Sequence, residues 1–445
     1  MLRFAPPPTQ TRRRRRFRRP AAAASASGSW VWGRLALGVV AATGMAGTRP
    51  AVADDPESQV LSVLQRAIDA DAASGMRVGS AIVTPSIEVD GTYDTNIFAS
   101  NHNAHGDWFT SIIPGVDIES DLPRHAFSLR AQGEVRQFAT FDRENTGDIS
   151  VEGTGRIDLA PNAYVLAGGG YQLLHEDRGA LVPVQGVSPT QFTVTSGKSS
   201  FVVEPAPLGL RLDLMVDSYG YNNVALPNGG VVPETARDHV TYALAPRMTY
   251  QIVSQYNAFI GAVVNRREYN STHEPDGVDR SSTGYQVDLG TSFKVPGFAA
   301  GEIYAGYLSQ DYDSHLVSPL SAVDFGGKLE WRPDDDTSVR FELRRSIEES
   351  SILGSPGYLQ TAVRLGIEEA LQPRFIVHGS IGYINADFAG AGGSSDLYEA
   401  KVGARYVINT NLLADLEYTY GLRASTSNLP RFTRQIVELR LRGQL

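Results

Sequence analysis

The sequence predicts an all-β fold, a transmembrane antiparallel up-and-down β-barrel of about eighteen strands, with sixteen strands as the alternative. Apolar and polar residues alternate with a period of two from about residue 84 to the C-terminus. The alternating segments run for about 11 to 16 residues. Strands of soluble sheets usually have about 5–6 residues, whereas strands that cross a bilayer at a tilt need roughly 9–11. Short and longer connections also alternate along the chain, as in a barrel with tight turns at one end and loops at the other.

The N-terminal segment has the three parts of an export signal. Arg12–Arg16 form a basic region, and Leu35–Ala46 form an apolar run that is too short to span a bilayer. Ala51-Val52-Ala53 then gives the small-x-small pattern of a signal-peptidase site. We therefore expect residues 1–53 to be a signal peptide. The alternative, an arginine-rich arm that binds RNA, does not account for the apolar run and the cleavage pattern that follow the arginines.

A short helix is expected between the signal and the barrel. Within Glu57–Asp69, the apolar residues Val60, Leu61, Leu64 and Ile68 share one helical face. We expect residues 54–83 to form a periplasmic N-terminal segment and residues 84–445 to form the barrel.

Composition excludes several classes of protein. The chain has no cysteine, which rules out disulfide scaffolds, thiolate metal sites and cysteine nucleophiles. Residues 54–445 contain 30 basic and 49 acidic side chains, a net charge of −19, so this part is a poor candidate for nucleic-acid binding. Beyond the signal, we find no run of 18 consistently apolar residues, so transmembrane helices are not expected.

The last strand shows the alternation most clearly. Val437, Leu439 and Leu441 point one way, and Glu438 and Arg440 point the other. A soluble sandwich alternates too, but here the polar face carries glycines and paired opposite charges, which is typical of a crowded or wet lumen. The strands are predicted at 84–94, 108–119, 124–139, 148–159, 163–175, 190–204, 208–222, 239–252, 256–269, 281–294, 299–312, 321–332, 337–348, 357–369, 373–387, 396–408, 411–423 and 432–445.

The connections indicate which way the barrel lies in the membrane. Those after even-numbered strands are short, as at Ala160-Pro161-Asn162 and Asn409-Thr410, whereas those after odd-numbered strands, such as 95–107 and 223–238, are longer. Bacterial outer-membrane barrels have short periplasmic turns and longer outer loops. We therefore expect the chain in the cell outer membrane of a Gram-negative bacterium, with both barrel termini in the periplasm.

Several segments resemble one family. The segments are Val78-Gly79-Ser80, Tyr93-Asp94-Thr95-Asn96-Ile97-Phe98, Ile113-Pro114-Gly115-Val116 and Arg344-Arg345-Ser346-Ile347-Glu348-Glu349. Together they resemble the Putative β-barrel porin 2 family over most of residues 78–445. The resemblance implies an outer-membrane barrel, often encoded with exopolysaccharide production and export genes. It implies outer-membrane lipid, the barrel assembly machinery and polysaccharide export proteins as partners. Unlike many such barrels, the chain ends in Leu445 rather than phenylalanine, which implies weaker recognition by the assembly machinery.

The search for catalytic or metal-binding motifs finds little. His102 and His105 share a loop with Asp107, and Asp334–Asp336 could bind a divalent cation, but both groups are more typical of polar loops and turns. Neither a G-x-S-x-G elbow nor an H-E-x-x-H helix is present in the sequence. We expect no enzyme activity, no metal and no cofactor. A barrel enzyme with an active site at the outer rim is the least favoured alternative.

Charged residues of the C-terminal half form the best candidate for a functional surface. By alternation they should face the lumen, where charge sets conduction and selectivity. An equally good interpretation is that they bond across neighbouring strands and stiffen the wall. The candidate lumen-lining residues are Arg340, Glu342, Arg364, Glu399, Lys401, Arg405, Asp415, Glu417, Arg423, Glu438, Arg440 and Arg442.

These observations predict a porin-like channel in which polar solutes, or exopolysaccharide, pass without chemistry. The alternative from a different class is a plugged structural or docking barrel of an envelope or polysaccharide export complex. The sequence leaves open the solute, the state of the lumen and the oligomeric state.

Overall fold

The computed structural model describes residues 75–270, 277–352, 354–390, 393–426 and 429–445. The predicted signal peptide at 1–53 and the predicted helix Glu57–Asp69 lie outside the described residues. In the described ranges, the helical segments are two short 3₁₀ turns, η2 (Asp142–Glu144) and η3 (Glu234–Arg237). No helix in these ranges is long and apolar enough to span a membrane.

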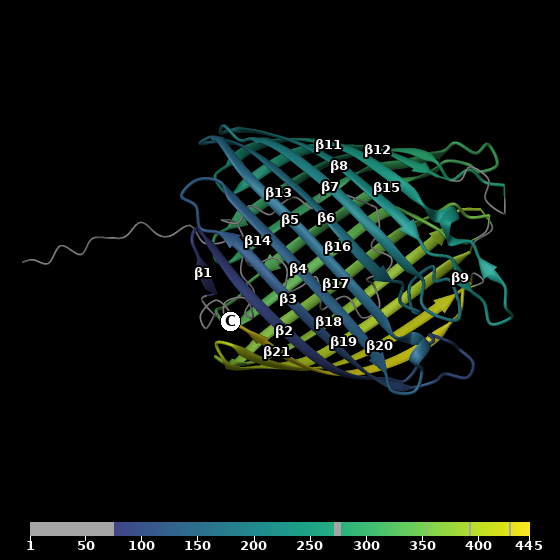
Figure 1. The fold of residues 1–445 in the computed structure, drawn as a ribbon. Coiled ribbons are helices and arrows are strands. Elements are labelled where there is room, and N and C mark those ends of the chain that lie inside the picture. The colour runs from purple at the N-terminus through teal and green to yellow at the C-terminus, as the bar shows by residue number, and fades with distance from the viewer. Residues whose placement is uncertain (1–74, 271–276, 353, 391–392, 427–428) are drawn as a thin grey trace, which may run out of the picture.

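The described residues form a closed barrel of eighteen antiparallel strands, tilted to the barrel axis (Figure 1). Consecutive strands pair with each other, and the last pairs with the first, which confirms the predicted fold class. The barrel strands are β2 (Ala81–Asp94), β3 (Asp107–Ser120), β4 (Ala126–Phe138), β5 (Thr146–Ala160), β6 (Ala163–His175), β7 (Gln191–Val203), β8 (Leu208–Tyr221), β11 (His239–Val253), β12 (Tyr256–Tyr269), β13 (Ser282–Val295), β14 (Ala299–Tyr312), β15 (Leu320–Trp331), β16 (Thr337–Glu349), β17 (Gly357–Gln372), β18 (Phe375–Phe388), β19 (Ser394–Asn409), β20 (Leu412–Ser425) and β21 (Phe432–Gln444).

Three small strands lie outside the ring. β1 (Met76–Val78) pairs with the beginning of β2. β9 (Val224–Ala225) and β10 (Val231–Val232) form a hairpin within the connection from β8 to β11. The observed barrel strands correspond one to one with the predicted strands and mostly differ at their ends by one to three residues, the usual uncertainty of strand boundaries.

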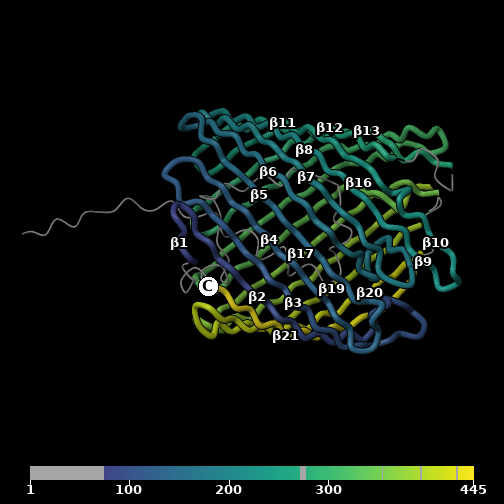
Figure 2. Tube along the Cα trace, in the orientation of Figure 1, coloured from purple at the N-terminus to yellow at the C-terminus, as the bar shows by residue number. Residues whose placement is uncertain are grey.

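The two ends of the barrel differ (Figure 2). At one end, here called the turn end, two to five residues join each pair of strands, and the C-terminus and β1 also lie there. The opposite end, here called the loop end, carries the longer connections, including the β9–β10 hairpin. An even number of strands places the beginning of β2 and the end of β21 at the same end.

Apolar side chains cover the outside of the wall, and polar side chains face inward. Ile303 and Leu289 are 63% and 67% exposed, whereas Asp324 and Asp415 are 0% and 1% exposed. This distribution is the reverse of a soluble protein. It is the pattern of a barrel whose outer surface contacts lipid, because lipid-facing and lumen-facing residues alternate along each strand. Closure of the ring also lets every strand hydrogen-bond its backbone N–H and C=O groups to two neighbours, since lipid offers these groups no partners.

The wall is irregular between β15 and β16. These strands pair only from Gly327–Trp331 to Val339–Leu343, near the turn end. By alternation Ile347 should face lipid, yet it is 7% exposed and packs with Leu308 and Leu359. The loop-end part of β16 therefore lies on the inner side of β14 and β15.

Two arginine side chains compensate for the interrupted ladder. Arg345 donates through Nη1 to the main-chain oxygen of Val323 at 3.0 Å. Arg267, on the inner face of β12, donates through Nη2 to the main-chain oxygen of Ile347 at 2.9 Å and pairs with Glu349 at 3.0 Å. These bonds replace part of the strand pairing, since unsatisfied carbonyls at membrane depth are costly.

Candidate conduction pathway

A dense network of charges lies on the inner faces of β18–β21, here called the charged wall. Arg405 and Asp415 oppose each other in register, and Arg405 Nε lies 2.7 Å from Asp415 Oδ2. Their side chains are 5% and 1% exposed. Arg440, opposite Asp415 on β21, lies 3.7 Å from it, so one carboxylate serves two arginines.

Two carboxylates oppose each other directly in this wall. Glu417 on β20 is the register partner of Glu438 on β21. Like charges in opposite positions destabilise a sheet. Arg440 offsets this repulsion, because it pairs with Glu438 and lies 3.7 Å from Glu417. Lys401 lies 3.7 Å from both Glu399 and Glu417 and adds a second cation.

The remaining predicted lumen residues are more dispersed. Arg340 pairs with Glu330 at 2.9 Å on the β15–β16 seam, with its side chain 41% exposed. Glu342 and Arg364 oppose each other in the β16–β17 ladder. Arg442 opposes Glu88 across the closing ladder of β2 and β21. The structure brings most of the predicted residues together on one side of the ring. Arg340, Glu342 and Arg364 lie outside the charged wall, and Arg442 lies at its edge beside β2.

Arg423 differs from the other predicted residues. It is 1% exposed and donates through Nη2 to the main-chain oxygen of Gly179, 2.6 Å away, and to that of Ala180. Its partners thus belong to the connection between β6 and β7.

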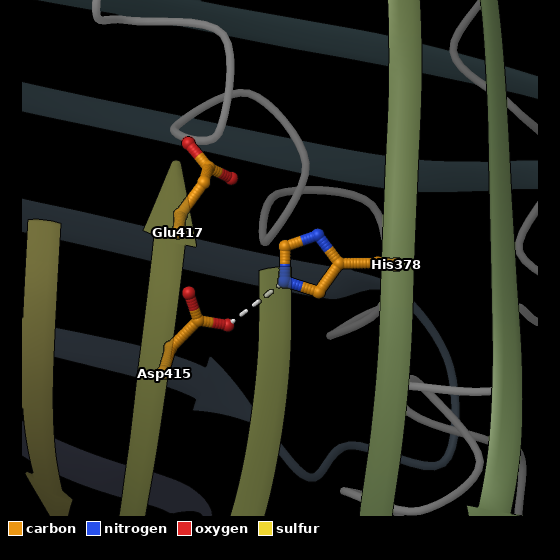
Figure 3. A group of neighbouring side chains, drawn as sticks. All are labelled: His378, Asp415 and Glu417. Carbon is orange, nitrogen blue, oxygen red and sulfur yellow. Dashed lines mark hydrogen bonds and ion pairs between the residues drawn. The ribbon is translucent and has the colours of Figure 1, made fainter. Parts of the chain in front are cut away.

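A histidine and two carboxylates of the charged wall converge (Figure 3). The ligand atoms of His378, Asp415 and Glu417 lie within 4.8 Å of one another, and His378 Nε2 lies 3.3 Å from Asp415 Oδ2. Gly403, on the strand between them, leaves room for the imidazole, because a Cβ there would collide with the ring. Arg405 and Lys401 already offset both carboxylates. The arrangement therefore supports an ion-pair network rather than a metal centre.

The connection between β6 and β7, residues 176–190, crosses the interior at the loop end and is here called the crossing loop. Leu181 and Val182 are 1% and 8% exposed and pack in a cluster with Tyr358, Ile384 and Leu397. Those partners belong to β17–β19, on the opposite side of the ring from β6 and β7. The crossing loop therefore bridges the barrel and narrows its interior.

Buried ion pairs anchor the beginning of the crossing loop. Arg178 makes a two-point contact with Glu144 of η2, at 2.7 and 3.0 Å, and the two side chains are 5% and 4% exposed. Asp177 accepts from Arg434 of β21 at 2.9 Å. Such pairs fix geometry strongly, because breaking one leaves a buried charge without its partner.

A third anchor lies in the β8–β11 connection. Arg237 binds Glu176 of the crossing loop and Glu234 of η3, each at 2.7 Å. Burial by itself would lower the pKa of Arg237. The nearby Glu176, Tyr221 and Glu234 raise it by more, so the pKa of Arg237 lies above its usual range. Burial also raises the pKa of Glu234, against the attraction of Arg237. The electrostatic environment thus favours a permanent cation at this point.

The connection from β16 to β17 also contacts the crossing loop. Ser351 Oγ donates to the main-chain oxygen of Val182 at 2.9 Å. Arg280 Nη1 donates to the main-chain oxygen of Ser350 at 2.9 Å, which ties the same connection to the β12–β13 side. Two inward segments therefore narrow the loop end together.

A family model described as Putative beta-barrel porin 2 matches residues 69–445. The chain belongs to this family. The match confirms the resemblance noted in the sequence. Together with the inside-out barrel, membership identifies the chain as a porin-like barrel of the outer membrane.

Solved structures with similar barrels have low sequence identity. OccK3 (OpdO) of Pseudomonas aeruginosa has 14% identity and a TM-score of 0.42, and the match covers 82% of this chain and 95% of that chain. OpdK of P. aeruginosa, solved with vanillate, has 12% identity, a TM-score of 0.44 and coverages of 82% and 99%. The siderophore receptor PirA of Acinetobacter baumannii has 7% identity, a TM-score of 0.45 and coverages of 82% and 80%. No curated protein matches the chain.

Reasoning from sequence missed the anchors of the crossing loop. Asp177 and Arg178 lie in a connection, where no periodicity assigns a face, and their partners are far away in the chain. One signal was present: Gly179–Val184 contains Ala180, Leu181, Val182 and Val184, which is unusually apolar for a loop expected to face water. An apolar run in a barrel porin connection indicates a segment folded into the interior.

Proposed function

We propose that this barrel is an outer-membrane channel through which polar solutes pass passively, without catalysis. The observation that carries the proposal is the closed eighteen-stranded wall, apolar outside and charged inside, among the described residues. Barrels of 16–18 strands are wide enough for an aqueous lumen. In this proposal, the loop end faces the exterior, and the turn end and both barrel termini face the periplasm.

Two structural elements would control passage. The crossing loop and the β16–β17 connection narrow the loop end, so they would limit the size of the solute. The charged wall would set ion preference, because rings and ladders of charge tune selectivity in pores. The twelve residues predicted from alternation are proposed to line the pathway, with Arg423 holding the crossing loop. No cofactor or reacting side chain is needed for this function.

The anchoring of the crossing loop favours a second candidate. Arg178, Arg237, Arg423 and Arg434 all hold this one segment through buried contacts. A segment held so firmly is compatible with a closed barrel that docks other envelope proteins, such as components of polysaccharide export. For the open channel, the family resemblance makes an exopolysaccharide chain an alternative cargo to small solutes.

Conductance in planar bilayers tests the proposal. The wild-type barrel is compared with a variant that lacks residues 179–184 of the crossing loop. The control variant lacks residues 314–317 of the β14–β15 connection, which also lies at the loop end. We expect steady wild-type conductance, a larger conductance after the crossing-loop deletion and no change in the control. Conductance only after the crossing-loop deletion would favour the plugged barrel, and silence of all three folded proteins would refute the channel.

A further inference from the structure

A cavity of about 580 Å³ lies at the loop end, between the β2–β3 connection and the ends of β19, β20 and β21. Its size is within the range of about 300–1,000 Å³ that is common for small-molecule sites. The charged, amide and aromatic side chains that border it are Asn96, Asn101, Asp396, Arg423, Arg431 and Phe432.

Arg423, on the border of this cavity, is a buried cation with no carboxylate hydrogen-bonded to it among the described residues. Its Nη2 donates to main-chain oxygens of the crossing loop, and its guanidinium lies 4.9 Å from the centre of the Phe432 ring. In the described part of the chain, its Nε and Nη1 have no hydrogen-bond partner. The neighbouring carboxylate of Asp177 is already bound by Arg434. A buried charge in this situation is costly unless an anion joins it.

A second arginine borders the same cavity. Arg431 is exposed, and its Nε donates to the main-chain oxygen of Ser425 at 2.9 Å. The carboxylate on the cavity border, Asp396, accepts from the hydroxyl of Tyr383 at 2.8 Å and from Asn385 at 2.9 Å. Two arginines against one acid, itself bound by neutral donors, leave the cavity with a surplus of positive charge.

We propose that this cavity binds a small organic anion that carries a carboxylate, with Arg423 and Arg431 as its charged ligands. Guanidinium groups bind carboxylates with paired, charge-assisted hydrogen bonds. Asn101 and Thr433 supply polar groups for hydroxyls of the same solute. The inference names the solute class of the channel and, to that extent, rests on the proposed function.

Binding would also act on the crossing loop. Nε and Nη1 of Arg423 are covered by protein, so the guanidinium must turn toward the cavity to bind a carboxylate. Turning breaks the bonds from Nη2 to Gly179 and Ala180, which hold the crossing loop against the wall. The same side chain therefore links solute capture to release of the narrowing segment.

Calorimetric titration of the full chain in detergent tests the site. Sodium glucuronate is compared with glucose, which has a similar volume and similar hydroxyl groups but lacks the carboxylate. We expect glucuronate to bind and glucose to release no measurable heat. Arg423→Gln should weaken glucuronate binding at least tenfold, Arg431→Gln should weaken it several-fold, and Arg143→Gln should not change it. Arg143 is an exposed arginine at the same end of the barrel, on η2.

Equal binding of glucose and glucuronate, or full glucuronate affinity in both Arg423→Gln and Arg431→Gln, would overturn the inference. Among the described residues, Arg431 Nε donates to Ser425 and not to the crossing loop, so its variant remains informative even if Arg423→Gln folds poorly. If the wild-type protein binds glucuronate but never conducts, the channel proposal is refuted and the binding site is supported. If it conducts in KCl but binds no glucuronate, the binding site is refuted and the channel proposal is supported.

Discussion

Arg434 of β21 donates through Nε to Asp94 of β2 at 2.6 Å, and through Nη1 to Asp177 of the crossing loop at 2.9 Å. Asp94 is completely buried, and the Arg434 side chain is 8% exposed. One guanidinium therefore joins the last strand, the first strand and the segment that narrows the interior. Closure of the ring and placement of the crossing loop depend on the same cation.

Replacement of Arg434 should destabilise the barrel more than replacement of a surface arginine. Arg434→Gln leaves Asp94 and Asp177 without their cation, and breaking a buried pair in this way typically costs about 3–5 kcal/mol. Arg143→Gln, on the exposed face of η2, should cost less than about 0.5 kcal/mol. Urea unfolding in lipid vesicles measures both values, and equal stabilities of the two variants would contradict the buried-pair interpretation.

Removal of one partner of the Arg178–Glu144 pair should loosen the crossing loop. Arg178→Gln leaves the Glu144 carboxylate, 4% exposed, without its cation. Replacement of both residues by leucine should restore much of the stability, because an apolar pair of similar volume often replaces a buried ion pair without loss. Chymotryptic cleavage between Leu181 and Val182, a site that all variants share, and conductance noise report on the loop. If the double variant is as labile as Arg178→Gln, the pair acts through something other than charge.

Removal of Arg440 should shift ion preference toward cations. Its guanidinium lies near Asp415, Glu417 and Glu438, so Arg440→Gln leaves an excess of negative charge on the charged wall. The reversal potential in a KCl gradient should move toward the potassium value, whereas Arg143→Gln should leave it unchanged. An unaltered reversal potential in Arg440→Gln would show that ions pass elsewhere.

A charge on the outer face of β21 should impair insertion. Leu441 is 45% exposed and lies between Val89 and Ala414 of the neighbouring strands. Leu441→Arg should cost about 2–4 kcal/mol near the middle of the bilayer and less near an interface. Arg442→Gln, one residue away on the inner face, is the matched control. Heat-modifiable gel mobility and yield in the outer membrane measure folding, and normal insertion of Leu441→Arg would show that this face does not contact lipid.

Engineered cysteines should locate the end of the β15–β16 ladder. Leu329 and Phe341 oppose each other in register, and Cα atoms of such pairs lie about 4.5–5.5 Å apart, within disulfide range. Val323 and Ile347 would oppose each other further toward the loop end if the same register continued. The chain has no native cysteine, so each double variant contains only the introduced pair. Oxidation should cross-link 329 with 341 and leave 323 and 347 free, and rapid cross-linking of both pairs would show a continuous ladder.

Alternation was enough to predict the wall but not its irregularity. Val437, Leu439 and Leu441 alternate with Glu438 and Arg440, and a one-residue shift would place all of them on the wrong face, so the pattern specifies strand and register together. The segment around Ile347 alternates less regularly, because Arg345 occupies a position that should face lipid, and its loop-end half lies inside the wall. The pattern weakens there, but it does not show that the strand has bent behind its neighbour.

The charged wall and the crossing loop were predictable to different degrees. Arg405 and Asp415 lie on adjacent strands, so their pairing follows from alternation and a short turn. Asp177 and Arg434 are separated by 257 positions, and Asp177 lies in a connection without period. Their contact depends on how the whole ring closes, which only the three-dimensional structure shows.

Closure between β2 and β21 also constrains the order in which the molecule can form. Asp94 and Arg434 meet although 340 positions separate them, and β2 has β3 as its only barrel neighbour until β21 arrives. Every shorter stretch of this chain is an open sheet with two free edges, and free edges recruit other chains. Contacts between such distant positions also form slowly, since the entropy of a long loop must be overcome first. The nascent polypeptide thus requires shielding from other chains during its passage to the membrane. Pairing of the final thirteen-residue strand, β21, with β2 removes both free edges and with them the site of aggregation.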